Sequence, residues 1–435
     1  MAARIRSLSV LNKLYRGGHE NRLLTLAQSL DREQFEHRIV TLTRDPGRTE
    51  EEQRAAGSLR PDYAAAGIEV DDLGLDPISG GWSGRLIAPA RFATAVRRLV
   101  RYIREFDIQL LDAHHTVAML AAGVAGRITG VPVIQTAYHT GVWRRPGLHW
   151  PGRQTLSNAA AIVTDSRFRA DEIRQWIRRE DVPIHVIPTG ISEPVPTISA
   201  EHVRSELGLP PVGGCRIVGQ VSGLLEFKGH LDLLEAAPRV LAEHPDVTFL
   251  CVGFSRGHTE YETRLKNRIA ELGLADRFLL LGWPGSIGDV WQVFDVFAHP
   301  SRFDSLPLVV IEAMALAKPS VVTSVGGITE FVEHERSGLV VDAEAPESLS
   351  TALNRLLSDE ELGRRLGERA CETYASQLTP AAMTAAVETL YERTASDETA
   401  PDRSGRYGRA SRSGLRQKSL IGGRPGTSGE FHCGR

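Results

Sequence analysis

The feature that most constrains the fold is the stretch from Ser301 to Val332, SRFDSLPLVVIEAMALAKPSVVTSVGGITEFV. Asp304 follows a Pro-Ser bend, and after seven intervening residues Glu312 stands at the start of an apolar run, EAMALA, of helical composition. A β-type run, SVVTS, then leads into Gly326-Gly327 and ends at Glu330. Loop, helix, strand and a glycine turn that opens another helix are typical of α/β folds.

The chemistry of this stretch indicates a ligand with two kinds of group. Carboxylates accept hydrogen bonds from sugar hydroxyls. A helix that begins at a glycine turn offers free N–H groups and a favourable dipole to phosphate. A site that combines both is suited to a nucleotide sugar.

The rest of the chain alternates β-type runs with amphipathic segments, which predicts doubly wound parallel sheets. We expect a helix at Arg91–Phe106, and strands include Ile5–Leu11, His37–Thr43, Gly67–Leu75, 106–115 and 131–141 in the first half. The fingerprint G-x-G-x-x-G is absent after the first of these strands, which argues against a dehydrogenase.

Composition excludes several other classes of protein. The chain has 435 residues, 42% hydrophobic and 24% charged, with a net charge of −3, which argues against a nucleic-acid binder driven by charge. Its four cysteines form no CxxC pair or metal spacing, and no apolar run approaches the roughly 20 residues that span a bilayer. We therefore expect a cytoplasmic protein without a metal.

The opening stretch resembles the acidic signature E-x7-E of retaining GT-B glycosyltransferases of family 4, with Asp304 in place of the first Glu. The segments EAMA, KPSVVTS and GGITEFV follow that family's order and spacing, and the resemblance covers most of residues 5–396. It implies an α/β GT-B fold, in which two Rossmann-like domains with parallel sheets face each other across a cleft. It also implies metal-independent transfer without a cofactor, the nucleotide sugar being a substrate and a UDP-sugar the favoured one.

The same resemblance divides the chain into parts. We expect an N-terminal acceptor domain at residues 1–190, a linker at 191–214 and a nucleotide-sugar domain at 215–375. A C-terminal helix at 376–396 is expected to return to the first domain. Residues 397–435 are rich in Gly, Ser and Arg and poor in aliphatic residues, which predicts a disordered tail.

The family's functional residues map onto this sequence one by one. The resemblance assigns catalytic roles to His139, Asp304 and Lys228: His139 near the reacting sugar, Asp304 on sugar hydroxyls, and Lys228 on the diphosphate. In the family an Arg precedes that Lys by about five residues, but here Gly223 occupies the position, so one expected phosphate contact is missing. The full donor-binding set is Gly17, Gly18, Lys228, Trp283, Asp304, Leu306, Glu312, Gly326, Gly327 and Glu330.

The acceptor side is expected to include His114, Arg144 and Arg145. His114 occupies a position like the family's HxH histidine, although Asp112 replaces the first His; a purely structural histidine is the alternative. The Arg-rich helix at 91–106 and the Trp-Arg loop at 141–154 suggest peripheral contact with anionic lipid at the inner membrane face. An ordinary solvated face is the alternative there.

We therefore expect a retaining glycosyltransferase that moves a sugar, of hexosyl type, from a nucleoside diphosphate to an acceptor hydroxyl in glycoconjugate, polysaccharide or glycolipid synthesis. The acceptor would be a sugar, a lipid-linked sugar or a small alcohol. Two other functions stay open from the sequence: another nucleotide-sugar enzyme on the same fold, such as an epimerase or a sugar-phosphate synthase, and a non-catalytic partner subunit.

Overall fold

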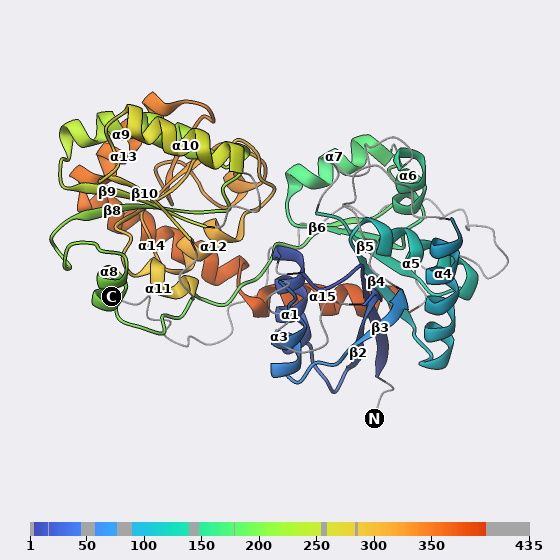
Figure 1. Ribbon diagram of the computed structural model, residues 1–435. Coiled ribbons are helices and arrows are strands. Elements are labelled where there is room, and N and C mark those ends of the chain that lie inside the picture. Colours follow the sequence, from blue (N-terminus) through green and yellow to red (C-terminus); the bar gives the residue numbers. More distant parts are fainter. Residues whose placement is uncertain are drawn as a thin grey trace.

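Two parallel β-sheets organise the chain into two domains that lie side by side (Figure 1). The structure is a computed structural model that describes residues 4–15, 17–44, 57–75, 89–138, 148–177, 179–253, 259–282 and 286–396. Apolar β-type runs form the buried strands, and amphipathic segments between them form helices that cover both faces of each sheet. The predicted α/β architecture is confirmed.

The first domain holds a seven-stranded sheet in the order β3-β2-β1-β4-β5-β6-β7. Its strands are β1 (Ile5–Leu11), β2 (Phe35–Thr43), β3 (Val70–Leu75), β4 (Leu110–His114), β5 (Val133–Thr136), β6 (Ala161–Thr164) and β7 (Ile184–Val186). One apolar core includes side chains of α1 (Gly18–Ser29), α3 (Arg60–Ala65) and the last helix, α15 (Pro380–Ala395). A second core includes side chains of α4 (Pro89–Glu105), α5 (Thr116–Thr129), α6 (His149–Ser157) and α7 (Arg167–Ile177).

The second domain holds a six-stranded sheet in the order β10-β9-β8-β11-β12-β13. Its strands are β8 (Arg216–Val221), β9 (Val247–Val252), β10 (Phe278–Leu281), β11 (Val296–His299), β12 (Ser320–Thr323) and β13 (Leu339–Val341). Its helices are α8 (Ala200–Glu206), α9 (His230–Glu243), α10 (Thr259–Glu271), α11 (Ile287–Trp291), α12 (Leu308–Ala315), α13 (Pro346–Ser358) and α14 (Glu360–Gln377). Two short 3-10 helices, η2 (Glu226–Lys228) and η3 (Ile328–Glu330), lie in loops.

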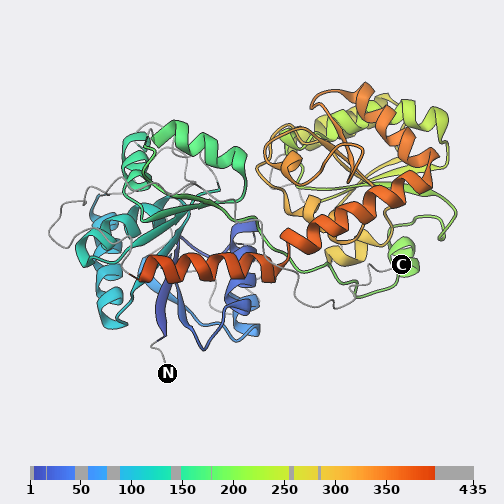
Figure 2. The ribbon, with the colours of Figure 1, turned by 180° about the vertical axis from the view of Figure 1, so that it is seen from behind.

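Helix α15 returns from the second domain and packs against one face of the first domain's sheet, the face turned toward the viewer in Figure 2. Where the chain crosses, the amide of Ile191 donates to the carbonyl of Leu378 at 3.1 Å. A Cβ on Gly190 would lie 2.2 Å from the carbonyl oxygen of Thr379, so only glycine permits this close approach. Further along, the hydroxyl of Tyr391 donates to the buried carboxylate of Asp112 at 2.7 Å and so anchors α15 to β4.

The structure differs from the sequence expectations in the opening stretch. Helix α12 begins at Leu308, so Glu312 lies inside the helix and not at its start. The glycine turn opens only the three-residue helix η3, which is too short to present the dipole of a full helix to a phosphate. Within the described residues, no helix combines the length and the apolar character that crossing a membrane requires.

Candidate active site

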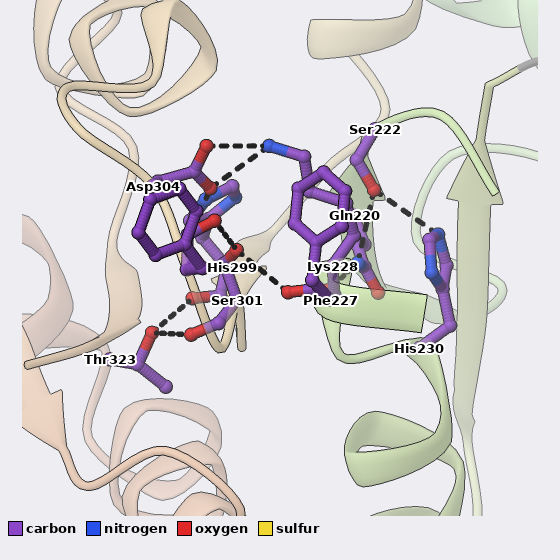
Figure 3. A network of polar contacts seen from close by, with 10 residues as sticks. Gln220, Ser222, Phe227, Lys228, His230, His299, Ser301, Asp304 and Thr323 are labelled. Carbon is purple, nitrogen blue, oxygen red and sulfur yellow. Dashed lines mark hydrogen bonds and ion pairs between the residues drawn. The ribbon is translucent and has the colours of Figure 1, made fainter. Parts of the chain in front are cut away.

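Lys228 and Asp304 are 76 residues apart in sequence, yet their side chains form an ion pair (Figure 3). Lys228 follows β8 and Asp304 follows β11, and these two strands pair side by side in the middle of the second sheet. The strand order reverses direction there, because β9 follows β8 on one side while β11 lies on the other. Ligands of open α/β sheets bind beyond the carboxyl ends of strands at such a switch point.

The carboxylate of Asp304 is held from two sides. The ammonium of Lys228 lies 2.7 Å from Oδ1 and 2.9 Å from Oδ2. Nε2 of His299, the last residue of β11, lies 2.9 Å from Oδ2. Burial alone raises the pKa of Asp304, but the hydrogen bond from His299 and the charge of Lys228 together hold it well below its usual range. Asp304 is therefore ionised.

The loops that carry the pair are fixed by hydrogen bonds to the backbone. Ser301 Oγ donates to the carbonyl of Phe227 at 3.0 Å, and Thr323 Oγ1 donates to the carbonyl of Ser301 at 2.5 Å (Figure 3). Gly229 follows Lys228 with φ of +72°, and a Cβ there would lie 1.8 Å from the carbonyl oxygen of Pro300. The glycine of the Lys-Gly motif thus allows the two loops to touch.

Neighbouring cations are occupied by other carboxylates. Nη2 of Arg302 lies 2.7 Å from the carboxylate of Asp232, and Nη2 of Arg264 lies 2.5 Å from that of Glu226. Gly223, at the position where the family has an Arg, lies against the loop of Gly253, whose Cβ would come 3.2 Å from the Gly223 amide nitrogen. Lys228 is thus the cation that the structure brings to the sequence-predicted acid.

Glu312 lies on α12 with its side chain half-buried, and its Oε2 accepts a hydrogen bond of 2.9 Å from the indole N–H of Trp291. Burial raises the pKa of Glu312, and the Trp291 bond only partly offsets this. In the described part of the chain, Oε1 of Glu312 makes no hydrogen bond. One oxygen is therefore fixed while the other is available to a ligand. Leu306, also predicted to bind the donor, packs its side chain into the apolar core.

The glycine pair is used differently from the expectation. Gly326 has φ of +58°, and a Cβ there would lie 1.8 Å from the carbonyl oxygen of Asp304. The amide of Gly327 donates to the carbonyl of Ser305 at 2.6 Å. The prediction that both amides point at a diphosphate therefore fails for Gly327, because its N–H group already has an acceptor.

Glu330 makes a contact between the domains. Its carboxylate accepts hydrogen bonds from the amides of Arg167 at 2.8 Å and Phe168 at 2.9 Å, in the first turn of α7 in the first domain. The hydroxyl of Ser166 accepts the next amide, that of Arg169, at 3.3 Å. Glu330 thus caps a helix of the other domain, and this arrangement does not direct it at a donor.

A second contact between the domains lies beside Asp304. The hydroxyl of Ser305 donates to the carboxylate of Asp165 at 2.6 Å, just after β6 of the first domain. Burial raises the pKa of Asp165, although the bonds from Ser305 and Ser166 oppose this. Asp165 was not predicted to lie beside the site, although its place at the end of a buried strand is a usable signal.

The glycine loop of the first domain also approaches the second domain. A Cβ on Gly18 would lie 3.5 Å from the side chain of Leu308 at the start of α12. Gly17 is the N-cap of α1, and a Cβ there would lie 2.8 Å from the carboxylate of Glu20, which lies 3.4 Å from Nε2 of His115. Gly17 and Gly18 therefore shape a tight loop beside the second domain.

His114 is a structural residue in this arrangement. Its side chain is 1% exposed, and Nε2 lies 3.4 Å from the carboxylate of Asp112. Asp112 also accepts hydrogen bonds from Thr136 at 2.6 Å and Tyr391 at 2.7 Å. The predicted acceptor role of His114 does not fit a ring that is buried at the carboxyl end of β4. The neighbouring His115 is the more exposed of the two.

Four predicted site residues, His139, Arg144, Arg145 and Trp283, lie outside the described residues, as does the tail 397–435. His299 contacts the carboxylate of Asp304 but was not predicted from the sequence as a site residue. Its position at the last residue of a strand, just before the acidic loop, is the signal that points to it. Within the described ranges, no group of three or more His, Cys, Asp or Glu side chains is arranged to hold a metal.

Comparisons with known proteins agree with this architecture. Residues 16–193 match the family described as Glycosyltransferase Family 4, and residues 210–373 match Glycosyl transferases group 1. The D-inositol 3-phosphate glycosyltransferase of Corynebacterium urealyticum is 30% identical over 218 residues, which cover 48% of this chain and 51% of the relative. The enzyme of the same name from Corynebacterium jeikeium is 27% identical over 327 residues, which cover 70% of this chain and 77% of the relative. The chain thus spans about half of the first relative's length and three quarters of the second's.

Among solved structures, Anabaena HepE in complex with UDP and glucose superposes with a TM-score of 0.73 at 21% identity. The match covers 89% of this chain and 99% of HepE, so the similarity extends over both domains. Together with the two family matches in chain order, it shows that this chain belongs to the family 4 glycosyltransferases of GT-B fold.

Proposed function

We propose that this chain transfers a sugar from a nucleoside diphosphate sugar to an acceptor hydroxyl, with retention of configuration at the anomeric carbon. The observation that carries the proposal is the pair Lys228–Asp304 at the switch point of the second sheet. A UDP-sugar is the favoured donor, which is supported by the UDP and glucose bound in HepE. The inositol phosphate in the relatives' names makes such a compound the first acceptor to test.

The geometry suggests which residues would bind the diphosphate, the ribose and the transferred sugar of the nucleotide sugar. An ammonium group has three N–H donors, so Lys228 can bind Asp304 and still direct one N–H at a diphosphate oxygen. The open oxygen of Glu312 would accept a ribose hydroxyl, while Trp291 holds the other oxygen. Asp304 would meet the hydroxyls of the transferred sugar, and His139 would approach that sugar from the first domain.

The charge state of Asp304 favours an electrostatic role. A carboxylate whose pKa lies below the usual range is a weak base, and its bonds to Lys228 and His299 occupy the oxygens that a nucleophile would need. A fixed negative charge beside the sugar instead stabilises the positive charge that develops as the diphosphate departs. This is unlike the two-carboxylate mechanism of glycosidases.

A thermal-shift screen of nucleoside diphosphates and their sugars tests the donor class, because a true ligand stabilises the folded state by mass action. Product analysis then compares donor alone with donor plus acceptor, beginning with D-inositol 3-phosphate. We expect stabilisation by a nucleoside diphosphate and a glycosylated product of unchanged anomeric configuration. An inverted product would refute retention, and a chain that binds none of these compounds would refute the donor assignment.

A further inference from the structure

A buried histidine lies directly under the acid that is proposed to act on the sugar. His299 is 0% exposed and ends β11, and the loop that follows turns back so that Asp304 lies over its ring (Figure 3). Nε2 of His299 and Oδ2 of Asp304 are 2.9 Å apart. The hydroxyl of Thr323 donates hydrogen bonds to the backbone of this turn, to the carbonyl of His299 at 3.3 Å and to that of Ser301 at 2.5 Å. These bonds fix the backbone of the turn, and the bond to Asp304 orients the imidazole beneath the carboxylate.

The contacts determine which nitrogen of His299 carries the proton. Asp304 is ionised and can only accept, so Nε2 must donate. Nδ1 is buried and has no hydrogen-bond partner among the described residues, which fits its unprotonated state. Burial is the main cause that lowers the pKa of His299. The charged and titratable groups that face it are Asp304, Lys228 and His230, and the ammonium of Lys228 further disfavours a second positive charge.

Donor binding should weaken the ion pair between Lys228 and Asp304, and the position of His299 compensates for this loss. A diphosphate attracts the ammonium of Lys228, which is then shared between the phosphate and Asp304. A buried carboxylate that loses part of its counter-charge tends to take up a proton or to rotate. The bond from His299 comes from the end of β11, beside β8, and from a buried ring, so it does not compete with the phosphate.

We infer that His299 is a positioning residue for sugar transfer: its Nε2–H group fixes Oδ2 of Asp304 and keeps the carboxylate charged while Lys228 turns to the donor phosphate. This role rests on the proposed function, in which Asp304 meets the transferred sugar. His299 itself touches neither substrate, so it acts only through Asp304.

Two variants separate the hydrogen bond from the space that the ring fills. His299→Leu removes the donor, and His299→Gln places an amide N–H near the position of Nε2. We expect the Leu variant to lower kcat about ten- to a hundredfold, the loss of one hydrogen bond to a charged group, with a smaller change in KM for the donor. The acid limb of the pH profile of kcat should move up by about one pH unit in the Leu variant, because Asp304 becomes easier to protonate. The Gln variant should recover most of the turnover.

A double mutant tests whether His299 acts through Asp304. In an Asp304→Asn background, His299→Leu should have little further effect on kcat, because the charged acceptor is already gone. Independent effects that multiply, equal losses in the Leu and Gln variants, or an unmoved acid limb would each overturn the inference.

Ligand-free measurements keep this test distinct from the proposed function. The 15N resonances of His299 in the wild-type protein should show the neutral Nε2–H form, and the 13C carboxyl titration of Asp304 should shift upward in His299→Leu. An Nδ1–H form or a charged ring would overturn the inference without any assay of transfer. If the wild-type protein bound no nucleotide sugar while both spectra behaved as expected, the donor assignment would fail and the hold of His299 on Asp304 would stand.

Discussion

The ammonium of Lys228 contacts both carboxylate oxygens of Asp304, at 2.7 and 2.9 Å, although the family resemblance assigns the two residues to different parts of the donor. Their side chains are only 17% and 14% exposed, so solvent screens the pair weakly. Without a donor, each residue neutralises the other. Donor binding must therefore redistribute this ion pair.

Replacing Lys228 should separate its two tasks. Lys228→Ala is expected to weaken nucleoside diphosphate binding by about 1.5–3 kcal/mol, the range for hydrogen bonds to charged groups. It also leaves Asp304 with His299 alone, so the variant should lose stability towards neutral pH as the buried acid ionises. Calorimetric titration with UDP measures the first effect. The control is Lys266→Ala, because Lys266 is 63% exposed and pairs with Glu262 on α10; equal affinities of the two variants would contradict the assignment.

Acid should destabilise the second domain through His230. This residue is 0% exposed, and burial lowers its pKa from 6.5 to about 3. The unfolded chain therefore binds a proton that the folded chain excludes. The contribution of His230 to stability is complete above pH 6.5 and is lost as the pH falls from 6.5 towards about 3. One such group contributes a slope of about 1.4 kcal/mol per pH unit.

The check is chemical denaturation of His230→Gln at pH values from about 7 to about 5, which should show a flatter pH dependence than the wild type. His202→Gln is the control, because the side chain of His202 is 59% exposed and pairs with Glu206 on the surface. An identical slope for His230→Gln and wild type would show that another group causes the acid sensitivity.

Glu330 should help to hold the domains together. Its two hydrogen bonds to the first turn of α7 cross from one domain to the other. We expect Glu330→Ala to weaken this contact by about 1 kcal/mol, the usual value of a helix cap. Small-angle scattering should then give a larger radius of gyration. Glu333→Ala is the matched control, since Glu333 is 65% exposed and pairs with Arg336 three residues along the chain; the idea fails if both variants scatter alike.

Two elements of the first domain are proposed to contact anionic lipid. Arg97, Arg101 and Arg104 are exposed on α4, and Trp150 on α6 is 70% exposed. We expect sedimentation with anionic vesicles that weakens as salt rises, and little with neutral vesicles. Changing the three arginines to Glu should abolish it. The same change at Arg336, Arg355 and Arg369, exposed in the second domain, should not. Equal binding to both lipids would refute the contact.

Elements with a clear β-type run were predicted well. Strand β1 has the expected bounds, Ile5–Leu11, because polar residues, Arg4 and Asn12, flank this β-type run. Strand β5 is shorter than the expected 131–141 and ends at Thr136, where its paired register with β4 and β6 ends, although apolar residues Ala137 and Tyr138 follow. Local pattern thus gives the identity of an element more reliably than its end.

The site residues could be predicted from the sequence only where they lie in one continuous segment. The order of Asp304, Glu312 and the glycine pair can be read from the sequence, but their contacts depend on partners elsewhere in the chain. Gly326 is required because its Cβ would strike the carbonyl of Asp304, and Glu330 faces α7 because the second domain packs there. No local pattern encodes such a contact between two loops or between two domains.

Asp304 is proposed to act on the transferred sugar and not on the nucleotide. The most direct test measures UDP affinity beside turnover for Asp304→Ala, with Glu312→Ala as the companion that should lose affinity for UDP and donor together. Because Asp304→Ala releases Lys228 from its ion pair, UDP should bind as tightly as to wild type or more tightly, while turnover falls about a hundredfold or more. A folded Asp304→Ala protein that no longer binds UDP, or that transfers sugar at the wild-type rate, would contradict the account.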